Sequence, residues 1–157
     1  MKEITKVVVD AMGGDNAPHE IIKGAVEAVG KSDAIHVILV GKEDVINQEL
    51  SGYTYNKEQI SVVHTSEVIE TAEPPVMAIR RKKDSSIVVG LKMVKDKEAD
   101  AFVSAGSSGA VLAGGQLLVG RIKGVERPPL APLIPTEKGF SILIDCGAVS
   151  YTHLTLP

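Results

Sequence analysis

The chain has 157 residues, of which 44% are hydrophobic and 24% charged, which is the composition of a globular protein with room for one domain. Its 17 basic and 20 acidic residues give a net charge of −3, so there is no general attraction to nucleic acid or to an anionic membrane. A single cysteine, Cys146, excludes an internal disulfide and fits a reducing cytoplasm. The longest apolar stretch, residues 110–120, is too short to span a bilayer, and the N-terminus lacks a signal-peptide pattern.

The first half of the chain alternates apolar strands with helices. Buried strands are predicted at residues 4–9, 35–40 and 60–63, where β-branched and other aliphatic residues cluster. Pro18 is well placed to open a helix after the first strand, and a short helix is expected near residues 43–50. The apolar face of the helix after Pro18, at helical spacing, is Ile21, Ile22, Ala25, Val26 and Val29.

The second half continues this alternation and adds a proline-rich break. One or two helical turns are expected over residues 76–82, followed by a helix that takes its N-cap from Asp84–Ser86. A strand at residues 100–104 precedes a helix that reaches about residue 119. The last apolar strand is expected at residues 140–144, after an irregular or edge segment marked by Pro128, Pro129 and Pro132.

Strands that alternate with helices and are apolar on both faces predict an α/β fold with a mostly parallel sheet covered by helices. Such sheets bind ligands beyond the carboxyl ends of their strands. Glycine-containing turns follow three of the predicted strands, at residues 10–16, 104–109 and 145–147. The sequence therefore predicts that these turns lie at the ligand-binding edge.

The turn at residues 104–109 carries the strongest chemical signal. Its glycines allow a ligand to approach the backbone, and the following helix presents unpaired N–H groups with a partial positive charge. Ser107 and Ser108 add hydroxyl donors, so the segment suits a phosphate or a developing oxyanion. The alternative is a plain glycine turn with a serine N-cap. The segment matches neither the dinucleotide-binding nor the Walker glycine pattern, which disfavours a nucleotide.

The turn at residues 10–16 is the second candidate. Asp10 and Asp15 are able to orient a hydrogen-bond donor or to hold a metal ion. The alternative is a strand-terminal turn in which Asp15 or Asn16 caps the next helix. His19, beside this turn, is either an acid–base group or, in the interpretation that we favour, a solvated histidine in a first helical turn. Cys146, a conceivable thiol nucleophile, is better explained as a buried structural residue.

The densest basic run offers a surface for an acidic partner through electrostatic steering. The usual explanation for such a run is a solvated face, and Glu70 and Glu73 precede it and would neutralise part of its charge. The run consists of Arg80, Arg81, Lys82 and Lys83.

Five segments in order together resemble the PlsX-type phosphate acyltransferase family, and the resemblance runs from Val7 to Ala148. The family usually continues the glycine loop as Gly-Asn-Thr-Gly or Gly-Ser-Thr-Gly, where this chain has Gly106-Ser107-Ser108-Gly109. After Ala148 the sequence departs from the family. We therefore expect a truncated N-terminal part, residues 1–148, and a non-family tail, residues 149–157. The five segments are Asp10–Pro18, Glu73–Ser86, Ala101–Gly106, Val119–Gly124 and Arg127–Pro128.

The resemblance implies a three-layer α/β/α Rossmann-like sandwich similar to isocitrate and isopropylmalate dehydrogenases. It also implies transfer of a fatty acyl group from acyl carrier protein to inorganic phosphate, for phospholipid synthesis, in a cytoplasmic homodimer without metal or cofactor. Peripheral membrane association of the full-length protein stays open. The basic run would dock the carrier protein. The resemblance points to Asp10, Ser107 and Ser108 as catalytic residues, and to Gly13, Gly14, Asp15, Asn16, Gly106 and Gly109 as substrate-binding residues.

Rival functions stay open at this point. Phosphotransacetylases, which use coenzyme A thioesters, and dehydrogenases, which use NAD, a hydroxy acid and a divalent metal, share the expected architecture by analogy. A chain of this length is alternatively an inactive fragment or a binding module with part of a pocket. Missing strands would then expose apolar edges that favour oligomerisation or aggregation.

Overall fold

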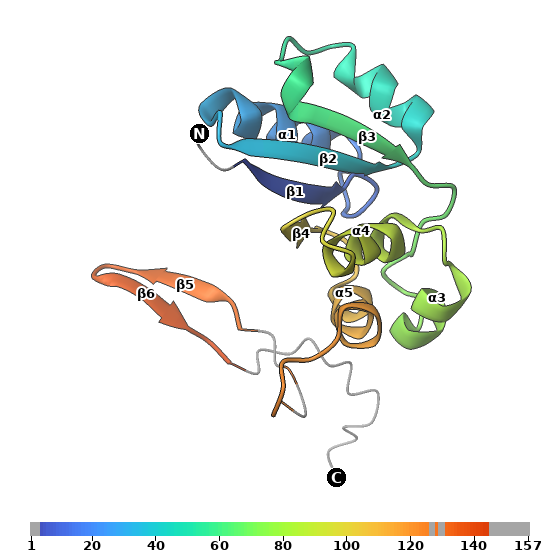
Figure 1. Cartoon of the computed structure of the whole chain (residues 1–157), viewed down its shortest axis with the longest axis vertical. Coiled ribbons are helices and arrows are strands. Elements are labelled where there is room, and N and C mark those ends of the chain that lie inside the picture. The colour runs from blue at the N-terminus through green and yellow to red at the C-terminus, as the bar shows by residue number, and fades with distance from the viewer. Residues whose placement is uncertain (1–3, 126–127, 129–130, 145–157) are drawn as a thin grey trace.

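The structure is a computed structural model that describes residues 4–125, 128 and 131–144. Its centre is a parallel four-stranded sheet with the strand order β3-β2-β1-β4, as shown in Figure 1. The predicted α/β fold with a mostly parallel sheet is therefore confirmed. The strands are β1 (Thr5–Asp10), β2 (Ile35–Gly41), β3 (Ile60–His64) and β4 (Ala101–Val103).

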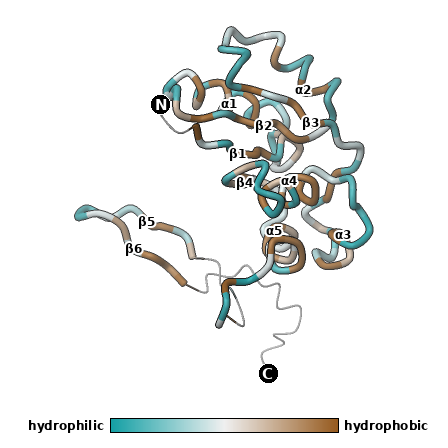
Figure 2. The backbone as a smooth tube through the Cα atoms, in the orientation of Figure 1, coloured by the Kyte–Doolittle hydropathy of each residue, from teal (hydrophilic) through white to brown (hydrophobic). Residues whose placement is uncertain are grey.

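Helices cover both faces of this sheet. On one face, α1 (His19–Lys31) and α2 (Glu43–Leu50) pack on Val37 and Leu39 of β2. On the other face, α4 (Ser86–Lys95) covers Ile38 and Val40. Successive side chains of a strand point to opposite faces, so β2 is apolar on both sides, and full burial of one such side chain contributes about 1.5–3 kcal/mol. Three layers result, and Figure 2 shows the hydrophobic colour concentrated in the strands and the inner helix faces.

A second group of helices packs on the outer side of α4. It consists of α3 (Pro75–Arg81), α5 (Ser108–Gly114) and η2 (Gly115–Val119), a π-helical turn that continues α5. Glycine at position 114 lets α5 approach α4 closely, because an added Cβ would lie 2.4 Å from Cδ1 of Leu91. The predicted cap of α4 is confirmed, since the hydroxyl of Ser85 accepts a hydrogen bond from the Val88 N–H. A 3-10 turn, η1 (Lys57–Gln59), precedes β3.

The last predicted strand lies elsewhere than expected. Residues 139–142 do form a strand, β6 (Gly139–Ile142), but it pairs antiparallel with β5 (Leu133–Thr136) in a separate two-stranded sheet. Both strands are exposed along their whole length, and Figure 1 shows the hairpin apart from the parallel sheet. The expectation that this strand extends the parallel sheet is therefore wrong. An apolar run predicts a strand but not the sheet that it joins. The partner strand β5 was not predicted, because Pro135 within it argues against a strand.

The order of the strands defines where a ligand is expected. From β1 the chain moves outward through β2 to β3, then returns to the other side of β1 with β4. The direction of winding therefore reverses between β1 and β4. Ligands of doubly wound sheets bind in the crevice outside the carboxyl ends of the strands at this switch point.

None of the helices in the described part of the chain is both long and apolar enough to cross a lipid bilayer.

Candidate functional site

The turns after β1 and β4 meet at the switch point, and Asp10 joins them. The pairing of Val9 with Val103 brings Asp10 beside Ser104, just beyond the shorter strand. The Ser104 hydroxyl donates to Oδ2 of Asp10 at 2.7 Å, and the Met12 N–H donates to Oδ1 at 3.1 Å. The N–H of Gly106 in turn donates to the Ser104 oxygen at 3.0 Å. The Asp10 side chain is buried, so this short chain of bonds holds both turns in one arrangement.

The two turns touch backbone to backbone, which their glycines permit. A Cβ on Gly13 would lie 2.3 Å from Oδ2 of Asp10 and 2.9 Å from the Gly106 nitrogen. A Cβ on Gly106 would lie 3.1 Å from the Gly13 Cα. Gly14 has a φ of 109° and lies against Ala105, in a conformation that side chains of L-residues rarely adopt. The structure thus brings together Asp10, Gly13, Gly14 and Gly106, which the sequence placed in two separate candidates.

The two serines of the second turn face different surroundings. Ser107 is buried and caps α5, because its hydroxyl oxygen accepts from the Ala110 N–H at 3.2 Å. The N-cap interpretation is therefore confirmed for Ser107, and its hydroxyl proton can still be donated to a ligand. Ser108, the first residue of α5, is exposed. Gly109 lies against α3, where an added Cβ would be 2.8 Å from Cγ of Pro75.

Asp15 and Asn16 lie at the outside of the first turn. Both are exposed, and α1 has Pro18 at its N-cap position without a side-chain hydrogen bond. The alternative in which one of these side chains caps α1 is therefore wrong. Among residues 4–125, 128 and 131–144, no group of three or more His, Cys, Asp or Glu side chains is arranged to hold a metal ion.

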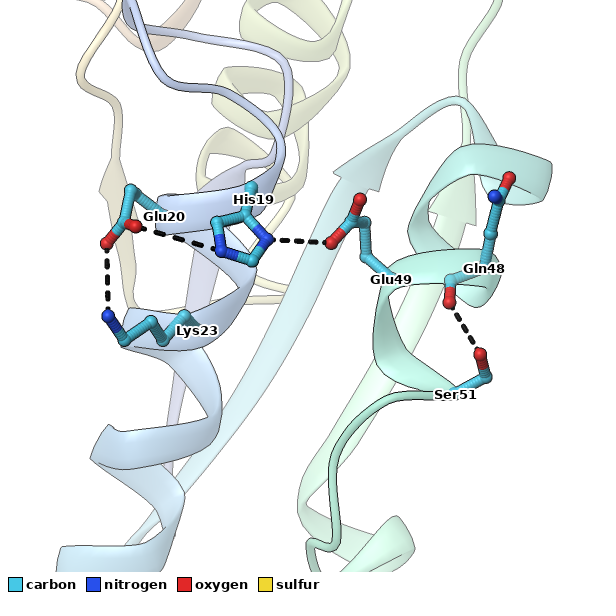
Figure 3. A network of polar contacts seen from close by, with 6 residues as sticks. All are labelled: His19, Glu20, Lys23, Gln48, Glu49 and Ser51. Carbon is cyan, nitrogen blue, oxygen red and sulfur yellow. Dashed lines mark hydrogen bonds and ion pairs between the residues drawn. The ribbon is translucent and has the colours of Figure 1, made fainter.

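His19 belongs to a surface network of polar contacts, which Figure 3 shows. Its Nδ1 lies 3.0 Å from Oε2 of Glu49 on α2, and its Nε2 lies 3.8 Å from Oε1 of Glu20. Lys23 pairs with the same Glu20 at 3.5 Å. Because 59% of the His19 side chain is exposed, the interpretation as a solvated histidine in a first helical turn is confirmed.

The basic run is divided by the fold. The Nζ of Lys82 donates to Oε1 of Glu73 at 2.5 Å and to the carbonyl of Val68 at 2.6 Å, so this lysine holds the preceding loop. Arg80, Arg81 and Lys83 are exposed. Lys82 therefore stabilises the fold through these bonds, as the neighbouring glutamates in the sequence suggested. The other three cations face solvent.

The pair between Lys82 and Glu73 is expected to make stability depend on pH. The hydrogen bond from Lys82, followed by the bond from the Glu70 N–H, holds the pKa of Glu73 below its ordinary value of 4.5. A depressed carboxyl pKa contributes stability above the unfolded-state value, and the contribution disappears as pH falls through the folded-state value. We therefore expect Glu73→Gln to lower the urea midpoint at about pH 7 and to have little effect at about pH 3. Glu70→Gln, which removes a neighbouring exposed carboxylate, is the control, and an equal Glu73→Gln effect at both pH values would contradict the assignment.

Ser104 belongs to the predicted turn at residues 104–109, but the sequence assigned it no role of its own. It follows β4 directly, as the turn at residues 10–16 follows β1, but its contact with Asp10 spans 94 positions in the chain. Its position at the carboxyl end of a strand was a signal for a ligand-binding residue. Its hydrogen-bond partner, Asp10, could be predicted only by knowing that β1 and β4 are neighbours. Cys146 and the turn at residues 145–147 lie outside the described residues, as does the predicted boundary at residue 148, so these stay predictions.

Comparisons with known proteins bear on the family and the fold of the chain. A phosphate acyltransferase of Alkaliphilus oremlandii is 60% identical over 143 residues, and one of Clostridium novyi is 57% identical, each alignment covering 91% of this chain. The chain spans only 42% and 43% of the length of these relatives. The solved EutD phosphotransacetylase of Staphylococcus aureus has a similar fold, with a TM-score of 0.58 and 20% identity over 91% of this chain and 46% of that one. The model of the family described as "Fatty acid synthesis protein" matches residues 5–154, so the chain belongs to this family.

Proposed function

We propose that the full-length protein of this chain transfers a fatty acyl group from acyl carrier protein to inorganic phosphate, giving acyl phosphate for phospholipid synthesis. The name of its relatives, phosphate acyltransferase, supports the reaction class. The observation that carries the proposal in the structure is the meeting of two glycine turns at the switch point, organised by buried Asp10. That is where a sheet of this kind binds its ligand.

The phosphate is assigned to the first turn of α5. The Gly106 N–H is already bonded to Ser104, and the Ala110 N–H is bonded to the Ser107 hydroxyl. The N–H groups of Ser108 and Gly109 lie at the start of the helix, where the backbone offers no intrahelical acceptor. With the hydroxyl protons of Ser107 and Ser108, they form a set of donors for a tetrahedral anion.

The reaction needs positioning more than deprotonation. The second pKa of a phosphate lies near 6 to 7, so the nucleophile is largely ionised at neutral pH. A phosphate oxygen forms a bond to the thioester carbonyl carbon, and the carbon–sulfur bond then breaks, leaving the carrier thiolate to take up a proton. Holding the two reactants together removes the entropic cost of their meeting. One well-aimed donor to the tetrahedral oxyanion contributes on the order of 3 kcal/mol.

Asp10 is assigned a positioning role within this proposal. Each of its carboxylate oxygens already accepts a hydrogen bond, one from Met12 and one from Ser104. The carboxylate is therefore engaged in holding the two turns, and the phosphate donors come from the α5 side. Gly13 and Gly14 form the adjoining wall, with Asp15 and Asn16 at its exposed rim.

The partners implied are inorganic phosphate and an acidic carrier protein, which exposed cations on the protein surface would attract. Homodimerisation, a cytoplasmic location and peripheral membrane association stay predictions. The rival reactions differ in their substrates, so assays with acyl carrier protein thioester, with coenzyme A thioester, and with NAD and a hydroxy acid separate them.

Removing the Ser108 hydroxyl tests the proposed phosphate site. In the full-length protein, Ser108→Ala is expected to raise the phosphate KM by about three- to tenfold, because one neutral hydrogen bond contributes about 0.5–1.5 kcal/mol. The measurement is phosphate-dependent release of the carrier thiol from acyl carrier protein thioester. Thr71→Ala, a change of another exposed hydroxyl that belongs to neither turn, is the matched control. An unchanged phosphate KM and kcat would remove Ser108 from the site, and absence of thiol release by the unmodified protein would contradict the function itself.

A further inference from the structure

A surface groove lies at the end of the α5–η2 segment opposite to the two turns. Its volume is about 490 Å³, and α3, α4 and η2 supply most of its lining. The proposed phosphate site uses none of its residues. The lining consists of Ile79, Arg80, Lys83, Val88, Lys92, Leu117 and Leu118.

The groove combines an aliphatic floor with a basic rim. Among its aliphatic lining residues, Ile79 and Val88 are buried and Leu117 is half exposed. Arg80, Lys83 and Lys92 are exposed around it. Such a surface stabilises an occupant by covering apolar area, while its cations select for opposite charge.

The rim cations differ in how far the protein itself neutralises them. Within the described residues, no carboxylate lies within 4.0 Å of the charged groups of Arg80 or Lys83. Lys92 lies in the field of Asp84, whose pKa is lowered by hydrogen bonds from Ser66 and then by the charges of His64 and Lys92. The side of the groove formed by Arg80 and Lys83 is therefore the more electropositive one.

We propose that this groove docks an acidic amphipathic helix of the carrier protein, an inference that rests on the proposed function. An amphipathic helix buries one apolar face and keeps the other in water, which matches a groove open to solvent on one side. A free alkyl chain would need cover on nearly its whole surface. Because α5 begins at the proposed phosphate site and η2 ends at the groove, a carrier docked here stands at the far end of the same helical segment.

This proposal differs from simple attraction to the basic run. Arg81 and Lys82 belong to the run but do not line the groove, and Lys82 is bonded to Glu73. Lys92 lines the groove but is remote from the run in sequence. A groove and a diffuse basic patch therefore make different predictions for adjacent arginines.

The first test compares Arg80→Glu with Arg81→Glu in the 157-residue chain. The probe is fluorescently labelled acyl carrier protein that bears a palmitoyl chain, and the measured quantity is its dissociation constant at low and high salt. We expect Arg80→Glu to weaken binding about five- to tenfold at low salt and Arg81→Glu less than about twofold. Lys92→Glu and Lys95→Glu, one groove and one non-groove position of α4, form a second matched pair. Equal effects within both pairs, or no binding by the unmodified chain, would overturn the groove.

The second test examines the apolar floor. Leu117→Gln is expected to weaken binding about threefold or more at both salt concentrations, whereas Val119→Gln, an exposed η2 residue outside the groove, is expected to have little effect. A fluorescent fatty acid that binds the chain and is lost with Leu117→Gln, while carrier protein does not bind, would assign the groove to an alkyl chain instead. Thiol release by a full-length protein with Arg80→Glu reports on the proposed reaction separately. The kcat is measured at saturating carrier protein, and the carrier KM is measured from a series of carrier concentrations. Turnover with an unchanged carrier KM would reject the groove and leave the reaction standing.

Discussion

Gly13→Ala is expected to destabilise the chain by about 2 to 3 kcal/mol, because the new methyl group has no space. Its carbon would lie 2.3 Å from the Asp10 carboxylate and 2.9 Å from the Gly106 nitrogen, well inside van der Waals contact. Neither neighbour is the far end of a flexible chain, since Asp10 is buried and bonded and the other atom is backbone. The free energy of unfolding in urea measures the effect.

Gly24→Ala supplies the matched control. Gly24 lies in α1 and an added Cβ there meets no atom within 4 Å. Alanine replaces glycine in a helix interior with a gain of about 0.5–1 kcal/mol, so this variant is expected to match or exceed the stability of the original chain. The close approach of the two turns would be refuted by a Gly13→Ala chain as stable as the Gly24→Ala chain.

Asp10→Ala is expected to cost about 3 kcal/mol of stability and to separate the two turns. The change leaves the Met12 N–H and the Ser104 hydroxyl, both partly buried, without their acceptor, and each unsatisfied group costs about 1–3 kcal/mol. Ser104 would then hold Gly106 less firmly, because its own hydroxyl loses its orientation. Urea unfolding gives the energy, and loss of the amide resonances of the turns to exchange broadening would report their separation.

Asp100→Ala is the control on the same pair of strands. The Asp100 carboxylate accepts one hydrogen bond from the Lys6 N–H at 2.8 Å, at the opposite edge of the sheet, and Asp100 is exposed. Water replaces an exposed acceptor, so the cost is expected to stay below about 1 kcal/mol. A double-mutant cycle of Asp10→Ala with Ser104→Ala is expected to give a coupling of about 1.5 kcal/mol or more. Strictly additive effects would show that the two side chains do not act as one unit.

Both predictions bear on how the proposed reaction is divided among residues. If Asp10 is a positioning residue, its loss affects stability and the binding of phosphate together, because the loops that carry the donors move. Ser108→Ala, in contrast, is expected to change the phosphate KM without changing stability, since its side chain is exposed. The two variants therefore distinguish a residue that builds the site from one that touches the substrate.

Local sequence patterns predicted most of the regular structure. The expected helix near residues 43–50 agrees with α2, and the first three strands were placed to within a residue or two. The buried face of α1, which includes Ile22, Ala25 and Val29, was readable from helical spacing. These features depend on side chains close in sequence, so a single sequence suffices for them.

Contacts between distant segments were not readable in the same way. The apolar residues of β6 predicted a strand, but its antiparallel partner β5 contains Pro135, and together they form an exposed hairpin that Figure 2 shows with apolar residues in both strands. The partner of β6 was chosen by backbone geometry rather than by residue type.

The sequence alone determined the apolar strands, the amphipathic helices, the two glycine turns and the family to which they point, because each is encoded in neighbouring residues. Tertiary structure decided that β4 returns to the open side of β1, which brings Asp10 to Ser104 and Gly13 to Gly106. The physical reason is that the neighbour of a strand is chosen by the packing of helices on the two faces of the whole sheet. The local pattern of β1 is the same whichever strand lies beside it.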